Sequence, residues 1–385
     1  MDEKKVLHIA LVGGQPMPLY LAIEDSKAEK FIMIHSSTTA DPARKLSTDI
    51  SGKMGLPVEL LEFDPLDFFA AKDRFEKLLE EYADWRIEAN ISGGTKPWST
   101  AMAVLSERYA NVELLYVDQN SRVYNYRTAE CKEVDPLGIE DIFQYNQTDV
   151  TAHTSLADYT QEDLELLPRI KKIRKNYPVP FNKVTIPNKS NRGKFTNKED
   201  SYIDPEFGSE ISWNKKHLKG GNTVQYVRLH FGGKAGRSEE FISPHAFDLV
   251  TSSGWFEYEV ATILKKWPSC KDVWLNVIFP YSNKFPKNEI DIIVGIGTKL
   301  LFVECKVQVF DRTDIDKFSA AVKNYGGSGA KAIFITQQYM GEPAEEKCQT
   351  NGIACFSFND ENKKLVSHKT LFDKLNKIAQ TSNAR

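Results

Sequence analysis

The stretch that most constrains the fold is a predicted hairpin at residues 288–306. Two apolar, β-branched runs flank Gly297-Thr298, and a glycine followed by a small polar residue suits a two-residue type II′ turn. Such a turn places Ile296 opposite Lys299, and the period-two alternation of strands then fixes the face of every other side chain. One face is apolar and predicts a core: Ile290, Ile292, Val294, Leu301, Val303 and Cys305.

The other face of this hairpin is polar. Counting outward from the turn, Asp291 lies opposite Glu304, and Glu289 lies opposite Lys306. Facing carboxylates repel each other, but a bound divalent cation turns them into a site, since two hard oxygen ligands suit Mg²⁺ or Mn²⁺. Lys306 can then polarise a metal-bound water or a phosphate oxygen. The alternative is an exposed sheet face with Glu289–Lys306 and Glu304–Lys306 ion pairs, and the facing carboxylates favour the metal site.

The order of Asp291 and then Glu304-Cys305-Lys306 resembles the PD-(D/E)xK restriction-endonuclease-like nucleases. The resemblance implies a phosphodiester-cutting endonuclease that depends on Mn²⁺ or Mg²⁺. It implies that Asp291 and Glu304 hold the metal, with the backbone carbonyl of Cys305 as a further ligand. It also implies that Lys306 assists the attacking water.

This family often carries a further glutamate on a preceding helix. The segment 254–260 supplies such a helix here, and Glu257 is a better match than Glu259. The seven histidines show no metal-ligand spacing, so zinc is not expected, and His245 is expected at the surface. The segments around the hairpin fit the nuclease core in the order helix 255–267, strand 272–279, hairpin, helix 313–325, strand 332–336, helix 343–349 and strand 353–358; a polar helix that frays is expected after Phe372.

The whole chain has the composition of a globular protein. It has 385 residues, enough for two or three domains, and a net charge of −3, so any surface for nucleic acid must be local. Its five cysteines form no CxxC pair, which predicts a reducing cytoplasmic location. No signal peptide or membrane-spanning apolar stretch is expected.

The first third of the chain alternates strands with helices. This pattern predicts an α/β, doubly wound, mostly parallel sheet of the Rossmann-like type. The predicted strands are 6–12, 31–35, 58–63, 86–91 and 112–117, and the clearest helices are 67–82 and 97–109.

Three of these strands end in loops rich in Gly, Ser and Thr. Ligands of open α/β sheets bind beyond the carboxyl ends of the strands, and helix N-termini with a lysine suit phosphate. Each loop alone is an ordinary capped turn, but three together favour an anionic ligand. The spacing fits neither a Walker A loop nor Gly-x-Gly-x-x-Gly, which argues against an NTPase or a dehydrogenase. The candidate binding residues are Gly13, Gly14, Gln15, Ser36, Ser37, Thr38, Asn90, Gly93, Gly94, Thr95 and Lys96.

The segment 90–97, Asn-Ile-Ser-Gly-Gly-Thr-Lys-Pro, resembles the matching loop of CARF domains, the sensors of cyclic oligoadenylate in type III CRISPR systems. A CARF domain followed by a PD-(D/E)xK domain resembles the ancillary nucleases that cyclic tetra-adenylate activates. The resemblance covers about residues 1–145 and 245–360. It implies cyclic tetra-adenylate as allosteric activator, RNA or DNA as substrate, and a role in antiviral defence. A symmetric ring is most simply bound by a homodimer.

The resulting division is a sensing domain at 1–145, a helical and basic connection at 146–244, and a nuclease domain at 245–385. Within the connection, the segment 181–221 has little periodicity. Its basic and aromatic residues fit single-stranded nucleic acid or a solvated linker equally well. The residues are Lys183, Lys189, Arg192, Lys194, Lys198, Lys215, Lys216 and Lys219, interleaved with Phe195, Tyr202, Phe207 and Trp213.

Two other functions stay open. One is a non-catalytic nucleotide sensor whose degenerate nuclease domain grips nucleic acid, against which the intact Asp291, Glu304 and Lys306 argue. The other is hydrolysis of the ligand by the N-terminal domain itself. The preference for DNA or RNA and the ring size of the activator do not follow from the residues.

Overall fold

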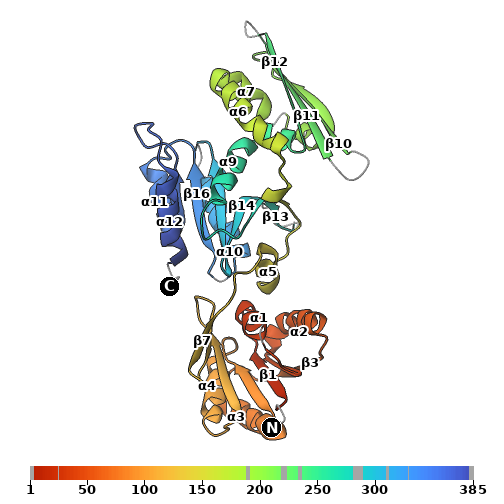
Figure 1. The fold of residues 1–385 in the computed structure, drawn as a ribbon, viewed down its shortest axis with the longest axis vertical. Coiled ribbons are helices and arrows are strands. Elements are labelled where there is room, and N and C mark those ends of the chain that lie inside the picture. Colours follow the sequence, from red (N-terminus) through yellow and green to blue (C-terminus); the bar gives the residue numbers. More distant parts are fainter. Residues whose placement is uncertain are drawn as a thin grey trace.

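The computed structural model of the chain describes residues 4–24, 26–187, 191–217, 223–232, 236–280, 289–308, 312–327 and 329–380. Three sheets follow one another along the molecule (Figure 1). The N-terminal sheet occupies one end, a mixed sheet lies in the middle, and a small antiparallel sheet forms the other end. None of the helices in these ranges is long and apolar enough to cross a bilayer.

The N-terminal sheet has seven strands in the order β3-β2-β1-β4-β5-β6-β7. Its first five strands are parallel, which confirms the α/β class, and two antiparallel strands extend one edge. All six residues of β1 are buried because helices cover both faces of the sheet. The strands are β1 (Val6–Leu11), β2 (Lys30–His35), β3 (Val58–Glu62), β4 (Arg86–Asn90), β5 (Val112–Val117), β6 (Arg122–Asn125) and β7 (Glu130–Glu133).

Helices cover both faces of this sheet. One apolar cluster packs the first two helices against it, and another packs the next two against the opposite face. The sequence did not predict β6 and β7, because their residues are half-buried or exposed and show no apolar alternation. The helices are α1 (Met17–Ile23), η1 (Ser37–Thr39), α2 (Ala40–Met54), α3 (Phe68–Glu81) and α4 (Lys96–Ser106).

Helix α5 (Ile139–Tyr145) joins the N-terminal sheet to the central one. The ring of Tyr145 stacks on Tyr20 of α1, with 4.4 Å between centroids. The ring of Phe143 lies 6.0 Å from Trp274 in the central sheet. One apolar cluster therefore runs from α1 and α2 through α5 into the middle of the molecule.

The central sheet has the order β17-β16-β15-β14-β13-β8. Its first pairs are parallel and the rest antiparallel, as the segment order predicted for the C-terminal part. One strand, β8, comes from within the segment predicted as a connection and pairs with β13. The strands are β8 (Ala152–Ser155), β13 (Asp272–Ile278), β14 (Glu289–Ile296), β15 (Lys299–Lys306), β16 (Lys331–Thr336) and β17 (Ala354–Ser357).

The predicted hairpin is present as β14 and β15. Ile296 pairs with Lys299, and Gly297 has φ +63°, the positive value that a II′ turn needs at its first position. The C-terminal helix does not fray after Phe372 as predicted; it continues to Gln380 because Leu375 is buried. The helices around this sheet are η2 (Leu156–Asp158), α9 (Gly254–Leu264), α10 (Thr313–Tyr325), α11 (Glu342–Thr350) and α12 (His368–Gln380).

The third sheet has the order β12-β11-β10-β9 and is wholly antiparallel. The segment 181–221, whose sequence has little periodicity, contains the end of α7 and two strands of this sheet. Ile211 and Trp213 are buried there while Ser212 and Asn214 are half-buried. The elements are α6 (Gln161–Asn176), α7 (Pro178–Thr185), η3 (Lys194–Thr196), β9 (Glu199–Ile203), β10 (Glu210–His217), β11 (Thr223–Phe231), β12 (Arg237–Ser243) and α8 (Ala246–Val250).

Candidate functional site

The loops after β1 and β4 lie against each other at the carboxyl edge of the N-terminal sheet. A Cβ atom added at Gly13 would lie 2.8 Å from the backbone nitrogen of Gly94. One added at Gly93 would lie 2.3 Å from the carbonyl oxygen of Leu11. These glycines are therefore required for close backbone approach, whereas Gly14 has open space around it. Two of the three predicted binding loops are thus brought together.

The polar residues at the start of α4 differ in their partners. The Asn90 side-chain oxygen accepts from the backbone nitrogen of Ser92 at 3.0 Å, so Asn90 holds the loop in place. The hydroxyl oxygen of Thr95 is buried and has no hydrogen-bond partner among the described residues. Lys96 is exposed at the first position of α4. An unpartnered buried hydroxyl beside a lysine and a helix N-terminus is the chemistry of an anion site.

The loop after β2 is occupied with its own hydrogen bonds. The Ser36 hydroxyl lies 2.9 Å from that of Thr38, and the Ser36 backbone nitrogen donates to the Thr39 hydroxyl at 3.0 Å. Ser37 is exposed and begins η1. This geometry is that of a capped turn, the simpler of the two interpretations of the sequence.

In the central sheet, Asp291 near the start of β14 lies beside Glu304 and Lys306 at the end of β15. The Lys306 ammonium is 2.5 Å from the Glu304 carboxylate and 3.7 Å from that of Asp291. The same oxygen of Asp291 accepts from the backbone nitrogen of Cys305 at 2.8 Å. The side chains of Asp291 and Glu304 are only 16% and 13% exposed. The hairpin therefore carries two poorly solvated carboxylates beside one ammonium.

The predicted cross-strand register is present at the turn. Pairing of β14 with β15 runs from Ile296–Lys299 to Ile292–Val303, in the register that counting from the turn predicts. Continued by one residue, this register places Asp291 opposite Glu304, and the Asp291 carboxylate accepts from the backbone nitrogen of the adjacent Cys305. The pairing of Glu289 with Lys306 stays a prediction.

The electrostatics of this cluster are unusual. Burial raises the pKa of the Glu304 carboxyl to about 8, and the charge of Asp291 adds to the shift. Burial also raises the pKa of Asp291 and of Glu257, and the charge of Asp291 raises that of Glu257 further. Burial lowers the pKa of Lys306, but the charges of Asp291 and Glu304 raise it overall. Burial and mutual repulsion therefore disfavour the ionised form of these carboxyls, and a bound cation would remove that cost.

The two helix glutamates separate clearly. Glu257 interacts with Asp291, Glu304 and Lys306, whereas the carboxylate of Glu259 lies 2.6 Å from the ammonium of Lys171 in α6. This arrangement agrees with the preference for Glu257 over Glu259.

The carboxylates of the hairpin are candidate ligands for a divalent cation. Within the described ranges, no three His, Cys, Asp or Glu side chains already converge as a metal centre. Two adjacent carboxylates with raised pKa nevertheless fit a hard cation such as Mg²⁺ or Mn²⁺, because its charge would relieve their repulsion. The ion pair of Glu304 with Lys306 also matches the alternative interpretation of an ion-paired sheet face.

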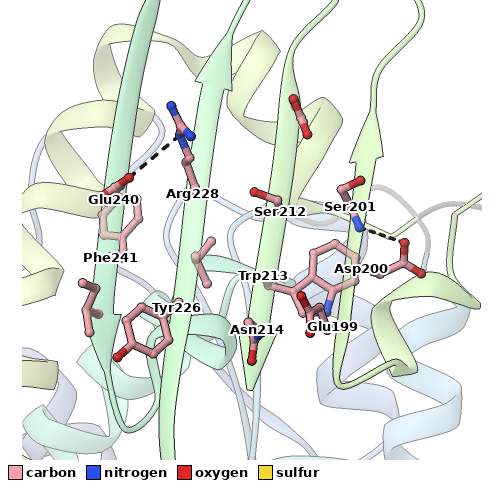
Figure 2. A pocket seen from close by; sticks show the side chains of 13 residues that line it. Glu199, Asp200, Ser201, Ser212, Trp213, Asn214, Tyr226, Arg228, Glu240 and Phe241 are labelled. Atoms are coloured by element: carbon pink, nitrogen blue, oxygen red, sulfur yellow. Dashed lines mark hydrogen bonds and ion pairs between the residues drawn. The ribbon is translucent and has the colours of Figure 1, made fainter. Parts of the chain in front are cut away.

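The outer face of the antiparallel sheet is hollowed, with a volume of about 580 Å³ (Figure 2). Its lining is acidic as well as basic: Glu240 approaches Arg228, and Glu199, Asp200 and Glu210 also line it. Trp213, one of the predicted base-stacking rings, is only 3% exposed. The mixed charge favours the solvated interpretation of this region over a nucleic-acid track. Lys189 and Lys219 lie outside the described residues.

Comparison with known proteins gives matches by structure alone. No protein-family profile and no curated protein sequence matches the chain. The solved structures that match along its length include the following two. Can2 from Sulfobacillus thermosulfidooxidans in complex with cyclic tetra-adenylate has 15% identity and a TM-score of 0.65, covering 98% of this chain and 100% of that one.

The second is the protein VC1899 from Vibrio cholerae. It has 15% identity and a TM-score of 0.68, and the match covers 98% of this chain and 99% of that one. This chain shares their fold. The expected α/β architecture, a Rossmann-like sheet followed by a further α/β domain, is confirmed.

Proposed function

We propose that this chain is a metal-dependent nuclease that cyclic oligoadenylate activates, as in type III CRISPR antiviral defence. The observation that carries the proposal is the presence, in one chain, of an anion-binding loop edge and a cluster of penalised carboxylates. The likeness to Can2 in complex with cyclic tetra-adenylate covers both parts and supports the same ligand class.

The ligand is bound at the carboxyl edge of the N-terminal sheet. The buried hydroxyl of Thr95 and the exposed ammonium of Lys96 are offered there to phosphate oxygens. The open space around Gly14 leaves room for a ligand to lie on the loops. Two copies of this edge in a homodimer would present equivalent donors to the two halves of a symmetric ring.

The cutting chemistry is assigned to the hairpin. Asp291 and Glu304 would hold the divalent cation, with the carbonyl of Cys305 as a further ligand, and Glu257 would complete the acidic wall. Bound there, the cation would supply positive charge to the phosphodiester as negative charge develops on it. The Lys306 ammonium, held by both carboxylates, positions the attacking water and stabilises the developing charge.

The deciding experiment is cleavage by the full-length protein. Single-stranded RNA, single-stranded DNA and supercoiled plasmid are incubated with Mn²⁺, with and without each cyclic oligoadenylate. We expect cyclic tetra-adenylate to raise the rate of cleavage of at least one substrate. Metal-dependent binding of nucleic acid without cleavage would instead support the non-catalytic sensor, and loss of the ring would identify a ligand-degrading N-terminal domain.

The sensing role has a separate test. Lys96→Ala should raise the activator concentration needed for half-maximal cleavage and leave the rate at saturation largely intact. Thr95→Ala should act in the same direction more weakly, because its hydrogen bond is neutral. Lys77→Ala, at an exposed lysine of α3, is the matched control. An unchanged half-activating concentration in Lys96→Ala would refute the sensing role but leave the nuclease assignment intact.

A further inference from the structure

A cavity of about 890 Å³ lies between the N-terminal and central sheets. Its walls come from three parts of the chain. Gln15 and Gln119 belong to loops of the N-terminal sheet, Asn146 follows α5, and Lys299 and Lys331 begin β15 and β16. The volume lies within the range of sites that hold small ligands of nucleotide size.

The wall of this cavity is strongly basic. Lys299, Lys323 and Lys331 line it, and no aspartate or glutamate does so in the described part of the chain. Lys331 is only 7% exposed, and Lys299 is half-buried. Burial lowers the pKa of both. The charge of Lys299 lowers the pKa of Lys331 further, whereas the charge of Asp118, outside the cavity lining, partly offsets the shift at Lys299. Poorly solvated ammonium groups that repel each other in a concave site attract an anion.

The cavity adjoins the proposed ligand edge. Gln15 lies in the loop after β1, the same loop whose Gly13 contacts Gly94 at the start of α4. A ligand seated on these loops therefore borders the wall formed by Lys299 and Lys331.

The cavity also adjoins the turn of the catalytic hairpin. The hydroxyls of Ser121 and Thr298 form a hydrogen bond, and the backbone nitrogen of Leu137 donates to the carbonyl of Gly297 at 2.9 Å. Lys299 follows this turn directly and opens the strand that ends in Glu304 and Lys306. The strand β15 thus begins at the cavity and ends at the proposed metal site.

We propose that Lys299 and Lys331 of the C-terminal domain bind phosphates of the same cyclic oligonucleotide that the N-terminal loops hold. The ligand then contacts both domains at once, and its binding energy acts directly on the hairpin turn. This inference rests on the proposed function. It assigns coupling to a bridging ligand, since a ligand shifts an equilibrium only through contacts that differ between the two states. Lys323, exposed at the end of α10, lies at the rim.

The test is binding of cyclic tetra-adenylate to the full-length protein by calorimetry. Lys299→Gln removes one phosphate contact and should weaken binding on the order of 10-fold, as expected for a charge-assisted hydrogen bond. Lys299→Arg keeps the charge and should retain most of the affinity. Lys317→Gln, on the exposed side of α10 with its side chain 75% exposed, is the control and should bind as the wild type does. Thermal melts confirm that each variant is folded.

The outcomes separate this inference from the function on which it rests. If the wild type binds and Lys96→Ala weakens binding while Lys299→Gln and Lys331→Gln do not, the bridging site is overturned and the sensor stands. If the wild type binds no cyclic oligoadenylate, both are overturned. If Lys299→Gln weakens binding and raises the half-activating concentration, while Lys299→Arg restores both, the bridging site is supported.

Discussion

Two buried acidic regions of this molecule behave in opposite ways. At the start of α6, Asp163 is fully buried, yet its pKa falls to about 2. Burial alone would raise the pKa of Asp163, but His245 lies 2.9 Å from the carboxylate and the backbone nitrogens of Thr160 and His245 donate to it. At the hairpin, the effect of burial outweighs that of the Lys306 ammonium, and the pKa of Glu304 rises to about 8.

The difference lies in the supply of donors. Asp163 has enough hydrogen-bond donors from the chain to remain an anion, so it acts as a structural cap. Among the described residues, Asp291 and Glu304 share one ammonium and one backbone donor. A site that its own fold leaves short of positive charge is suited to bind a cation. His245, expected at the surface, thus belongs to the structural region.

The largest expected effect comes from removing the shared ammonium of the hairpin. Lys306→Ala should lower the rate of activated cleavage by roughly 10²–10⁴-fold, the usual contribution of a positioned catalytic group. Binding of the activator should not change, because Lys306 lies at the opposite end of β15 from Lys299 and does not line the proposed ligand cavity. The measurement is single-turnover cleavage at saturating Mn²⁺ and activator, with Lys317→Ala as control. Near-wild-type turnover would remove Lys306 from the mechanism.

A substitution at Asp163 should change the stability of the fold and leave cleavage unchanged. Asp163→Asn should lower the free energy of unfolding by about 2 kcal/mol. The pKa of Asp163 falls from 3.8 in the unfolded chain to about 2 in the folded one, and this shift measures how much the fold stabilises the anion. Cleavage per folded molecule should be unchanged. Asp41→Asn, at a side chain 89% exposed, is the control in urea denaturation. Equal stabilities of Asp163→Asn and wild type would contradict the contrast drawn above.

The two helix glutamates sharpen the boundary of the site. Glu257→Gln should reduce cleavage on the order of 10-fold, as for residues that support metal ligands. Glu259→Gln breaks only the partly exposed pair with Lys171 and should leave cleavage unchanged. Rates measured across a Mn²⁺ titration compare the two. If Glu259→Gln has the larger effect, the assignment of the helix residue is reversed.

Glu304→Gln should change metal binding and metal-free stability in opposite senses. In EDTA the variant should be more stable than the wild type by about 1 kcal/mol, because the penalty on the anion disappears. The stabilisation that Mn²⁺ gives to the wild type should be lost. Thermal melts with EDTA and with Mn²⁺ test both. Undiminished Mn²⁺ stabilisation would refute Glu304 as a ligand.

The pH dependence of stability should differ in sign between the regions. The pKa of Asp163 is lowered in the folded state, so its contribution is present above pH 3.8 and is lost as the pH falls through about 2. The pKa of Glu304 is raised, so its contribution is present below pH 4.5 and is lost as the pH rises through about 8. The measurement is the melting temperature in EDTA as a function of pH. Asp163→Asn should flatten the loss of stability below pH 3.8, and Glu304→Gln should flatten the loss between pH 4.5 and about 8.

The sequence predicted the hairpin well because its signal is local. Gly297 sets the turn, and the adjoining apolar runs fix the register near it. The hydrogen bond of the Asp291 carboxylate with the backbone nitrogen of Cys305 was not predicted, because alternation carries no information about such a contact. The pairing of Asp163 with His245 joins residues distant in sequence, so no local pattern marks it.

The antiparallel sheet was missed for a different reason. The apolar alternation of β10 is short, and the lysines and asparagines around Ile211 and Trp213 resemble a linker in composition. The wall formed by Lys299 and Lys331 was missed as well. Its members are adjacent only because β15 and β16 pair in parallel, with Leu301 opposite Lys331.

The position of β8 bears on how the chain is made. This edge strand leaves the ribosome before the whole antiparallel sheet, but its partner β13 follows about a hundred residues later by the numbering, 272 against 152. The N-terminal sheet has all its strands early and can fold during synthesis, whereas β8 must wait unpaired. Nascent chains arrested between residues 160 and 270 should therefore expose a strand edge, the form in which a helper chaperone would meet this protein.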